Sequence, residues 1–170
     1  MKRFIWFMIP FLVLGVVLAV YAEEGLYGND EESIIRVINS IEGYENMSIE
    51  ILEIKDFINE RVVPILADGS PGYIEFDQDK DGNYKWRHLE VRNQETFSTF
   101  IPNVMEEMTP FLIVTNGEND IAKMTVDING QPTEVEFQPM KASVKWIELP
   151  NLKNSFTDYR YYDNSGNLIE

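Results

Sequence analysis

The longest apolar run of the chain lies near its N-terminus, where residues 4–22 contain no charged side chain. Lys2 and Arg3 precede this run, and Glu23 and Glu24 follow it. As a helix, these residues would rise roughly 28 Å, about the thickness of the hydrocarbon core of a bilayer. Because basic flanks stay in the cytoplasm, the pattern predicts a transmembrane anchor with the remainder of the chain outside the cell.

A cleaved signal peptide is the alternative, since Ala22 provides a small residue at the end of the run. The run is longer than the usual apolar core of a signal, which favours the anchor. Residues 23–170 are exported in either case. We expect a single-pass protein of the cell membrane with its C-terminal domain outside, or a secreted protein if the chain is cut after Ala22.

A short polar stretch and an amphipathic helix follow. Residues 23–30 contain two glycines and predict a tether. Asn29 or Asp30 is suited to cap a helix. The isoleucines at positions 34, 35, 38 and 41 then fall on one helical face, and Gly43 is a natural stop.

From Ser48 the apolar period changes to two, which predicts strands separated by turns. Pro64 favours an edge strand or a bulge within residues 62–66. The clearest hairpin joins residues 73–76 to 84–91 through the Asp-Gly turn at 80–83. Further strands are expected at residues 111–115, 121–128, 133–137, 143–149 and 159–162, with hairpin turns at 116–119 and 129–130 and a further turn at 164–167.

Residues 97–108 interrupt the strands with apolar positions at helical spacing. Proline is tolerated in the first turn of a helix, so we expect an irregular lead-in followed by a short second helix that opens at Pro102.

These elements predict an α+β fold. The expected domain, residues 31–170, is one antiparallel, curved meander sheet packed on the amphipathic helix, in the element order of cystatin-like or NTF2-like domains. Residues 1–22 are the anchor or signal, and residues 23–30 are the tether.

Charge narrows the functional classes. The chain has 29 acidic residues, and residues 23–170 keep 12 of its 14 basic residues, so the exported part carries a formal charge of −17. Such a surface excludes non-specific nucleic-acid binding, which needs cationic side chains. It suits a basic partner or a divalent metal, although solubility alone also explains it. The absence of cysteine removes disulfides and thiolate chemistry, and fits an envelope in which folding needs no disulfides.

Three segments, residues 51–56, 62–76 and 79–86, resemble small exported proteins of spore-forming Gram-positive bacteria. Their shared features are strand and turn patterns. The resemblance therefore implies an envelope location and carries over no functional residue.

The sharpest chemical pattern is the sequence DQDKDG, in which Asp77, Asp79, Asp81 and Gly82 match the first half of a calcium loop. The match then fails, because His88 occupies the position of the bidentate glutamate. A hairpin turn explains the same residues without metal, so calcium remains an alternative, and no other cofactor is expected.

Catalytic patterns are weaker. His88 is the only histidine, on a strand expected to place Tyr84, Trp86, His88 and Glu90 on one face. No nucleophile motif accompanies it, and dispersed carboxylates suggest a hydrolase without indicating a particular pair.

The leading hypothesis is a non-enzymatic, membrane-tethered domain that binds an envelope or secreted protein, of the immunity or inhibitor type. Its interface would use the acidic surface and four aromatic residues, Tyr84, Trp86, Tyr159 and Tyr161. A ligand- or calcium-binding module and an envelope hydrolase are the alternatives.

Overall fold

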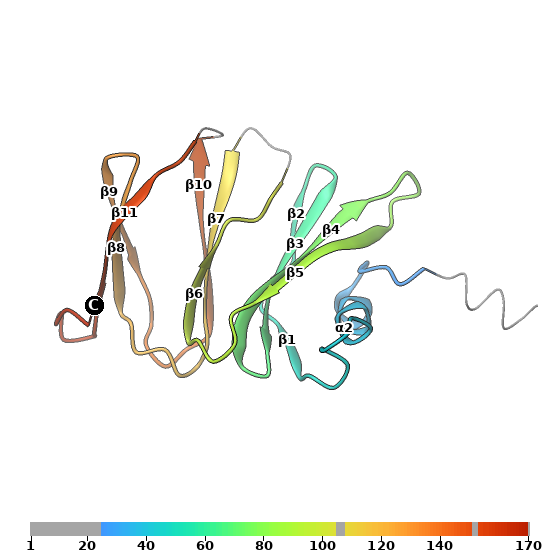
Figure 1. The fold of residues 1–170 in the computed structure, drawn as a ribbon, viewed down its shortest axis with the longest axis horizontal. Helices are drawn as coiled ribbons and strands as arrows, with labels where there is room; N and C mark the ends of the chain where they lie inside the picture. The colour runs from blue at the N-terminus through green and yellow to red at the C-terminus, as the bar shows by residue number, and fades with distance from the viewer. Residues whose placement is uncertain (1–24, 105–107, 151–152, 170) are drawn as a thin grey trace, which may run out of the picture.

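The computed structural model of the chain describes residues 25–104, 108–150 and 153–169. In this part of the chain, one short helix and eleven strands form four layers: the helix and three antiparallel sheets. Figure 1 shows the layers in succession along the long axis, with α2 at one end and the C-terminus at the other. This confirms an α+β fold that is mostly antiparallel sheet. The predicted anchor at residues 4–22 lies outside the described residues, within which no helix is long and apolar enough to cross a bilayer.

Sheet A contains the first five strands, in the order β1-β3-β4-β5 with β2 also paired to β3. The bounds are β1 Ile49–Ile51, β2 Lys55–Phe57, β3 Glu60–Ala67, β4 Ser70–Gln78 and β5 Tyr84–Val91. Sheet B has the order β10-β7-β6, with β6 Phe97–Phe100, β7 Met108–Thr115 and β10 Ser143–Pro150. Sheet C has the order β11-β8-β9, with β8 Lys123–Ile128, β9 Gln131–Glu136 and β11 Phe156–Tyr162.

Helix α2 spans Glu31–Asn39, and its start confirms the predicted cap. The Asp30 carboxylate accepts a hydrogen bond from the Ser33 N–H at 2.8 Å, and the Ser33 hydroxyl accepts one from the Asp30 N–H at 2.9 Å. This reciprocal pair satisfies two of the free N–H groups at the helix start. The buried face of the helix then packs on sheet A through Ile34, Val37 and Ile38.

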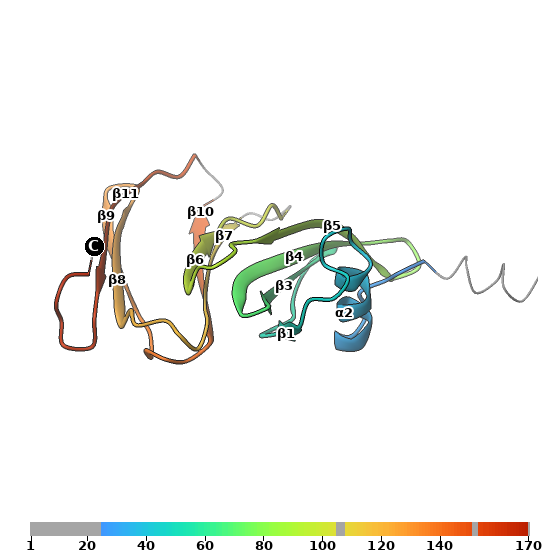
Figure 2. The same cartoon turned by 60° about the horizontal axis from the view of Figure 1, so that its bottom comes forward.

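Three apolar cores separate the layers. The first lies between α2 and sheet A, the second between sheets A and B, and the third between sheets B and C. Strand β3 is buried along its whole length because its side chains alternate between two of these cores. Val63 and Ile65 face α2, whereas Val62 and Leu66 face sheet B. The expected single curved sheet is therefore wrong: the strands form a stack of three (Figure 2).

Two local predictions around β7 are also wrong. Phe97–Phe100 is strand β6 rather than the approach to a helix, because it pairs with residues 112–115 of β7. Residues 101–104, including Pro102, are irregular, and residues 105–107 of the predicted helix lie outside the described residues. The turn at residues 116–119 does not close a hairpin, since β7 belongs to sheet B and β8 to sheet C. Here tertiary packing outweighs local propensity.

Other turns follow the prediction. Strands β4 and β5 form the expected hairpin, and β8 and β9 pair across Asn129 and Gly130, whose φ angles of 56° and 78° suit a tight turn. Pro64 lies in a central strand rather than at an edge. Its carbonyl accepts a hydrogen bond from Leu52 in the gap between β1 and β2, so its missing N–H faces a break in the neighbouring strands.

The described part of the predicted tether is docked on β5. The Gly28 N–H donates to the Tyr84 carbonyl at 2.8 Å, and Arg61 donates to the carbonyls of Gly28 and Asn29 at 2.8 and 3.0 Å. The Arg61 guanidinium also lies 3.9 Å from the centre of the Tyr84 ring. These contacts hold the N-terminal segment at the α2 end of the stack.

Candidate functional site

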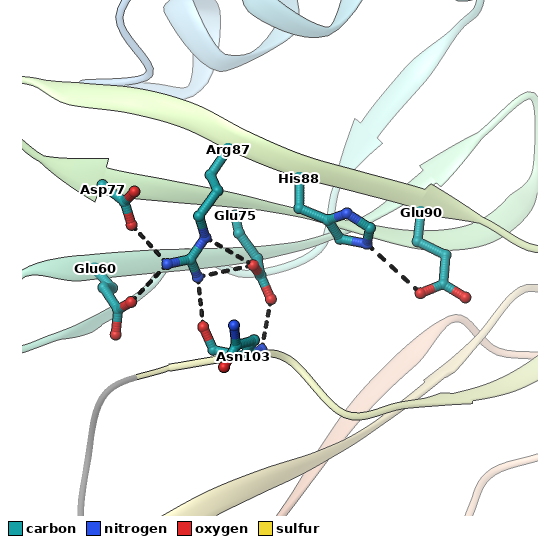
Figure 3. A network of polar contacts seen from close by, with 7 residues as sticks. All are labelled: Glu60, Glu75, Asp77, Arg87, His88, Glu90 and Asn103. Carbon is teal, nitrogen blue, oxygen red and sulfur yellow. Dashed lines mark hydrogen bonds and ion pairs between the residues drawn. The ribbon is translucent and has the colours of Figure 1, made fainter.

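A polar cluster around Arg87 lies on the face of sheet A that meets sheet B (Figure 3). Arg87 Nη1 donates to Glu60 and Asp77 at 2.8 and 2.7 Å. Nε and Nη2 both donate to Glu75, and Nη2 also donates to the Asn103 carbonyl. All five N–H donors of the guanidinium are therefore committed within the protein. The cluster joins two sheets and leaves Arg87 without a donor for a ligand.

A β-bulge explains how Arg87 reaches this face. Glu75 pairs with His88 and Phe76 pairs with Trp86, so Arg87 between them has no Cα partner on β4. The extra residue exchanges the two faces of sheet A for the side chains of β5 beyond the bulge. The predicted single face is therefore wrong: Trp86 pairs with Phe76 on the α2 side, whereas the His88 ring lies 5.7 Å from Tyr73 on the sheet B side.

The His88 Nε2 atom lies 3.8 Å from the Glu90 carboxylate. Burial raises the pKa of the nearby Tyr73 hydroxyl, and the charge of Glu75 adds to the effect. Tyr73 packs in the core between sheets A and B.

Two of the three aspartates of the suggested calcium loop have separate roles within the protein. Asp77 binds Arg87, and the Asp79 carboxylate accepts hydrogen bonds from the N–H groups of Asp81 and Asn83 at 2.9 and 3.0 Å. These hydrogen bonds lower the pKa of Asp79, and the bond from the Asn83 N–H has the largest effect. In the described part of the chain, no three histidine, aspartate or glutamate side chains are grouped so that they could hold a metal ion.

The four aromatic residues of the suggested interface lie on two different sheets. Tyr84 packs on the core beneath α2, and Trp86 beside it is 45% exposed. Tyr161 packs between sheets B and C, with Tyr159 stacked on it at 6.5 Å. The structure therefore brings together two of the four residues at each end of the stack and does not form one aromatic surface.

The strongest candidate site is a cleft where the ends of sheets A and B meet, with a volume of about 500 Å³. Six segments line it: β1, the end of β3, the β3–β4 turn, the start of β4, the connection from β5 to β6, and the connection from β7 to β8. Four carboxylates belong to this lining, those of Glu50, Asp68, Glu95 and Glu118. None of the described lining residues is basic. This cleft, which we call the acidic cleft, suits a cationic group.

Hydrogen bonds fix the walls of the acidic cleft. Asn116 is 7% exposed, and its side-chain N–H group donates to the Gly69 carbonyl at 2.8 Å, which connects sheet B to the β3–β4 turn. Asp68 accepts a hydrogen bond from the Ser48 N–H at 2.8 Å. The Glu95 carboxylate accepts one from the Ser98 hydroxyl at 2.6 Å. Two of the four acidic groups, Asp68 and Glu95, thus belong to an ordered frame.

Sequence reasoning missed this cleft because its carboxylates come from segments far apart in the chain. The only signal was the charge excess, which does not locate a site. Comparison with known proteins adds no location either, since no protein-family model, curated protein or solved structure matches the chain.

Proposed function

We propose that this chain is a non-enzymatic, membrane-tethered domain of the cell envelope that binds a basic protein. The observation that carries the proposal is the acidic cleft, whose described lining has four carboxylates and no basic residue. A cleft of this kind attracts lysine or arginine side chains and repels acidic ones.

The distribution of ion pairs supports an acidic binding surface. Six basic side chains of the described residues form ion pairs within the protein: Arg36, Arg61, Lys85, Arg87, Arg92 and Lys123. These six basic side chains are paired within the protein, and acidic residues outnumber basic residues more than twofold in the whole chain. The excess negative charge therefore remains on the surface.

Residues 4–22 supply the anchor in this proposal, and cleavage after Ala22 would instead release a secreted form of the same domain. The docked segment 25–30 lies at the α2 end of the stack, and sheet C lies at the opposite end (Figure 1). The acidic cleft between sheets A and B would thus stand away from the attachment point. A tether raises the effective concentration of the domain near membrane partners without any chemistry.

An immunity or inhibitor role is the specific form of this proposal. Charge complementarity speeds encounter with a basic toxin or enzyme at the outer face of the membrane. The resemblance of residues 51–56, 62–76 and 79–86 to small exported proteins of spore-forming Gram-positive bacteria agrees with that setting. The hydrolase alternative gains no support from the Arg87 cluster, because its carboxylates bind one guanidinium.

The test is a pull-down from solubilised envelope with the full chain as bait, at low and high salt. Wild type should retain a stoichiometric basic protein that high salt releases. The variant Glu50→Lys/Glu118→Lys should lose it. The variant Glu42→Lys/Asp81→Lys, which changes the net charge equally outside the cleft, should keep it. If no basic protein is retained in any lane, the proposal fails.

A further inference from the structure

A second cleft adjoins the acidic cleft on the other side of residues 94–96, which line both. Its volume is about 390 Å³. Its walls come from β6 of sheet B, from β11 of sheet C, and from residues 120–121 that connect the two sheets. The two clefts therefore follow one end of the stack, across the joint between sheets A and B and then the joint between sheets B and C.

The floor of the second cleft is apolar. Phe97, Ile121, Tyr161 and Ile169 line it. The Phe97 and Tyr161 rings meet edge to face, with centroids 5.4 Å apart. Ile169 is 42% exposed. Its backbone is held in place, because its N–H donates to the Tyr161 carbonyl at 2.7 Å. The site thus presents an ordered aliphatic and aromatic surface to solvent, of the kind that anchors a partner side chain.

The rim of the same cleft is acidic. Glu95 and Asp120 line it, Glu118 follows in the acidic cleft, and none of the described lining residues of either cleft is lysine, arginine or histidine. An apolar floor beside a negative rim matches a segment that combines apolar and basic side chains.

We propose that the two clefts form one docking groove for a basic, amphipathic peptide segment of the partner protein. Apolar side chains of that segment occupy the second cleft, and its lysine or arginine side chains face Glu95, Asp120 and the acidic cleft. This assignment rests on the proposed function, and it specifies the chemistry of the partner segment that binds. A second copy of this chain fits poorly, because each copy carries a formal charge of −15.

The probe is a short synthetic peptide of alternating lysine and leucine with one photo-crosslinking residue, added to the detergent-solubilised full chain. A peptide with glutamate in place of lysine is the control. We expect crosslinks to residues 94–97 and 161–169 from the basic peptide only. Asp120→Lys and Ile169→Ser should each weaken its binding about 5-fold or more.

Matched variants outside the groove distinguish binding in the groove from a general effect of net charge or of exposed apolar surface. Asp81→Lys makes the same charge change on the β4–β5 turn, and Leu26→Ser removes an apolar side chain that is 51% exposed at the other end of the stack. Both should bind the basic peptide within about 2-fold of wild type. Equal losses in these variants, or crosslinks elsewhere, would overturn the groove while leaving protein binding intact.

Self-association gives the opposite assignment. If sedimentation shows a dimer that Ile169→Ser abolishes, the groove belongs to a second copy and the peptide proposal is wrong. If neither the peptide nor any basic envelope protein binds, the failure lies in the proposed function itself, since that result does not depend on the groove variants.

Discussion

Glu75 on β4 and Arg87 on β5 share two hydrogen bonds, from Nε at 3.1 Å and from Nη2 at 2.8 Å to the same carboxylate oxygen. The other oxygen of Glu75 accepts a hydrogen bond from the Asn103 N–H at 2.7 Å, in the segment that follows β6. The Glu75 side chain is 3% exposed. One buried carboxylate therefore connects two strands of sheet A to the segment that follows β6 of sheet B, beside the apolar core between these sheets.

Removing the cation from this cluster should be strongly destabilising. Arg87→Met would leave the buried carboxylates of Glu60 and Glu75 without the guanidinium, and the loss of one partner of a buried ion pair costs about 3 kcal/mol or more. The free energy of unfolding in urea measures this loss. Glu75→Gln in the Arg87→Met background should recover part of it, since it removes one uncompensated charge.

Arg92→Met is the matched control, because Arg92 is half exposed in its ion pair with Glu90. An exposed pair contributes about 0.2–1 kcal/mol, so this change should be small. If both arginine variants lose the same stability, the Arg87 cluster is not a buried link between the sheets.

The strands themselves were largely predictable from the sequence, but their division into sheets was not. The Asp-Gly pair at 81–82 correctly indicated the β4–β5 hairpin. The run Val62–Leu66 also contained a signal for the stack, because a strand with one solvated face alternates, whereas this run is apolar throughout and β3 is buried on both faces. The break between β7 and β8 had no such signal: the turn at 116–119 reads like a hairpin, and only packing separates the sheets.

The candidate sites were hard to predict for two physical reasons. Simple alternation predicts that Trp86 and His88 share one face of β5. The bulge at Arg87 inserts one residue between them, and His88 therefore lies on the opposite face. The acidic cleft depends on the meeting of distant segments, so that Glu50 and Glu118 line one space although they are far apart in sequence. Neither event follows from local periodicity.

Acid should selectively weaken the β4–β5 turn. Backbone hydrogen bonds, with that from Asn83 the largest, lower the pKa of Asp79 below its ordinary value of 3.8. A group with a depressed folded-state pKa stabilises the protein above its unfolded pKa, and this stabilisation is lost as the pH falls through the folded-state pKa. Asp79→Ala should therefore be less stable than wild type at neutral pH, and the difference should shrink below about pH 4.

The measurement for this prediction is the difference in urea unfolding free energy between wild type and Asp79→Ala, followed from neutral pH to about pH 2.5. Asp81→Ala removes the same charge from the same turn and serves as the control. A wild-type advantage over Asp79→Ala that stays constant down to the lowest pH would show that the carboxylate charge does not support the turn.

Docking of the N-terminal segment should tolerate no side chain at Gly28. A Cβ at this position would lie 2.2 Å from the ring of Phe76, which is fully buried. Gly28→Ala should therefore cost about 1–3 kcal/mol or release residues 25–30 from β5. Urea unfolding detects the first result, and faster amide hydrogen exchange at Gly28 detects the second.

Gly117→Ala is the control, because a Cβ there meets nothing within 4 Å. Its stability should change by about 0.5 kcal/mol or less. If Gly28→Ala matches this control in both stability and hydrogen exchange, the close contact with Phe76 does not hold the segment.

Calcium should leave the melting temperature of the wild-type chain unchanged within about 1 °C at about 1 mM, a concentration that fills weak extracellular sites. Asp77 already binds Arg87 at 2.7 Å, and one oxygen of Asp79 accepts two backbone N–H groups. An ion would have to displace these partners. A thermal melt with calcium and then with chelator gives the result. A calcium-dependent rise that persists in Glu42→Gln but disappears in Asp79→Asn would restore the aspartate turn as a metal site, because only the second change removes a carboxylate from it.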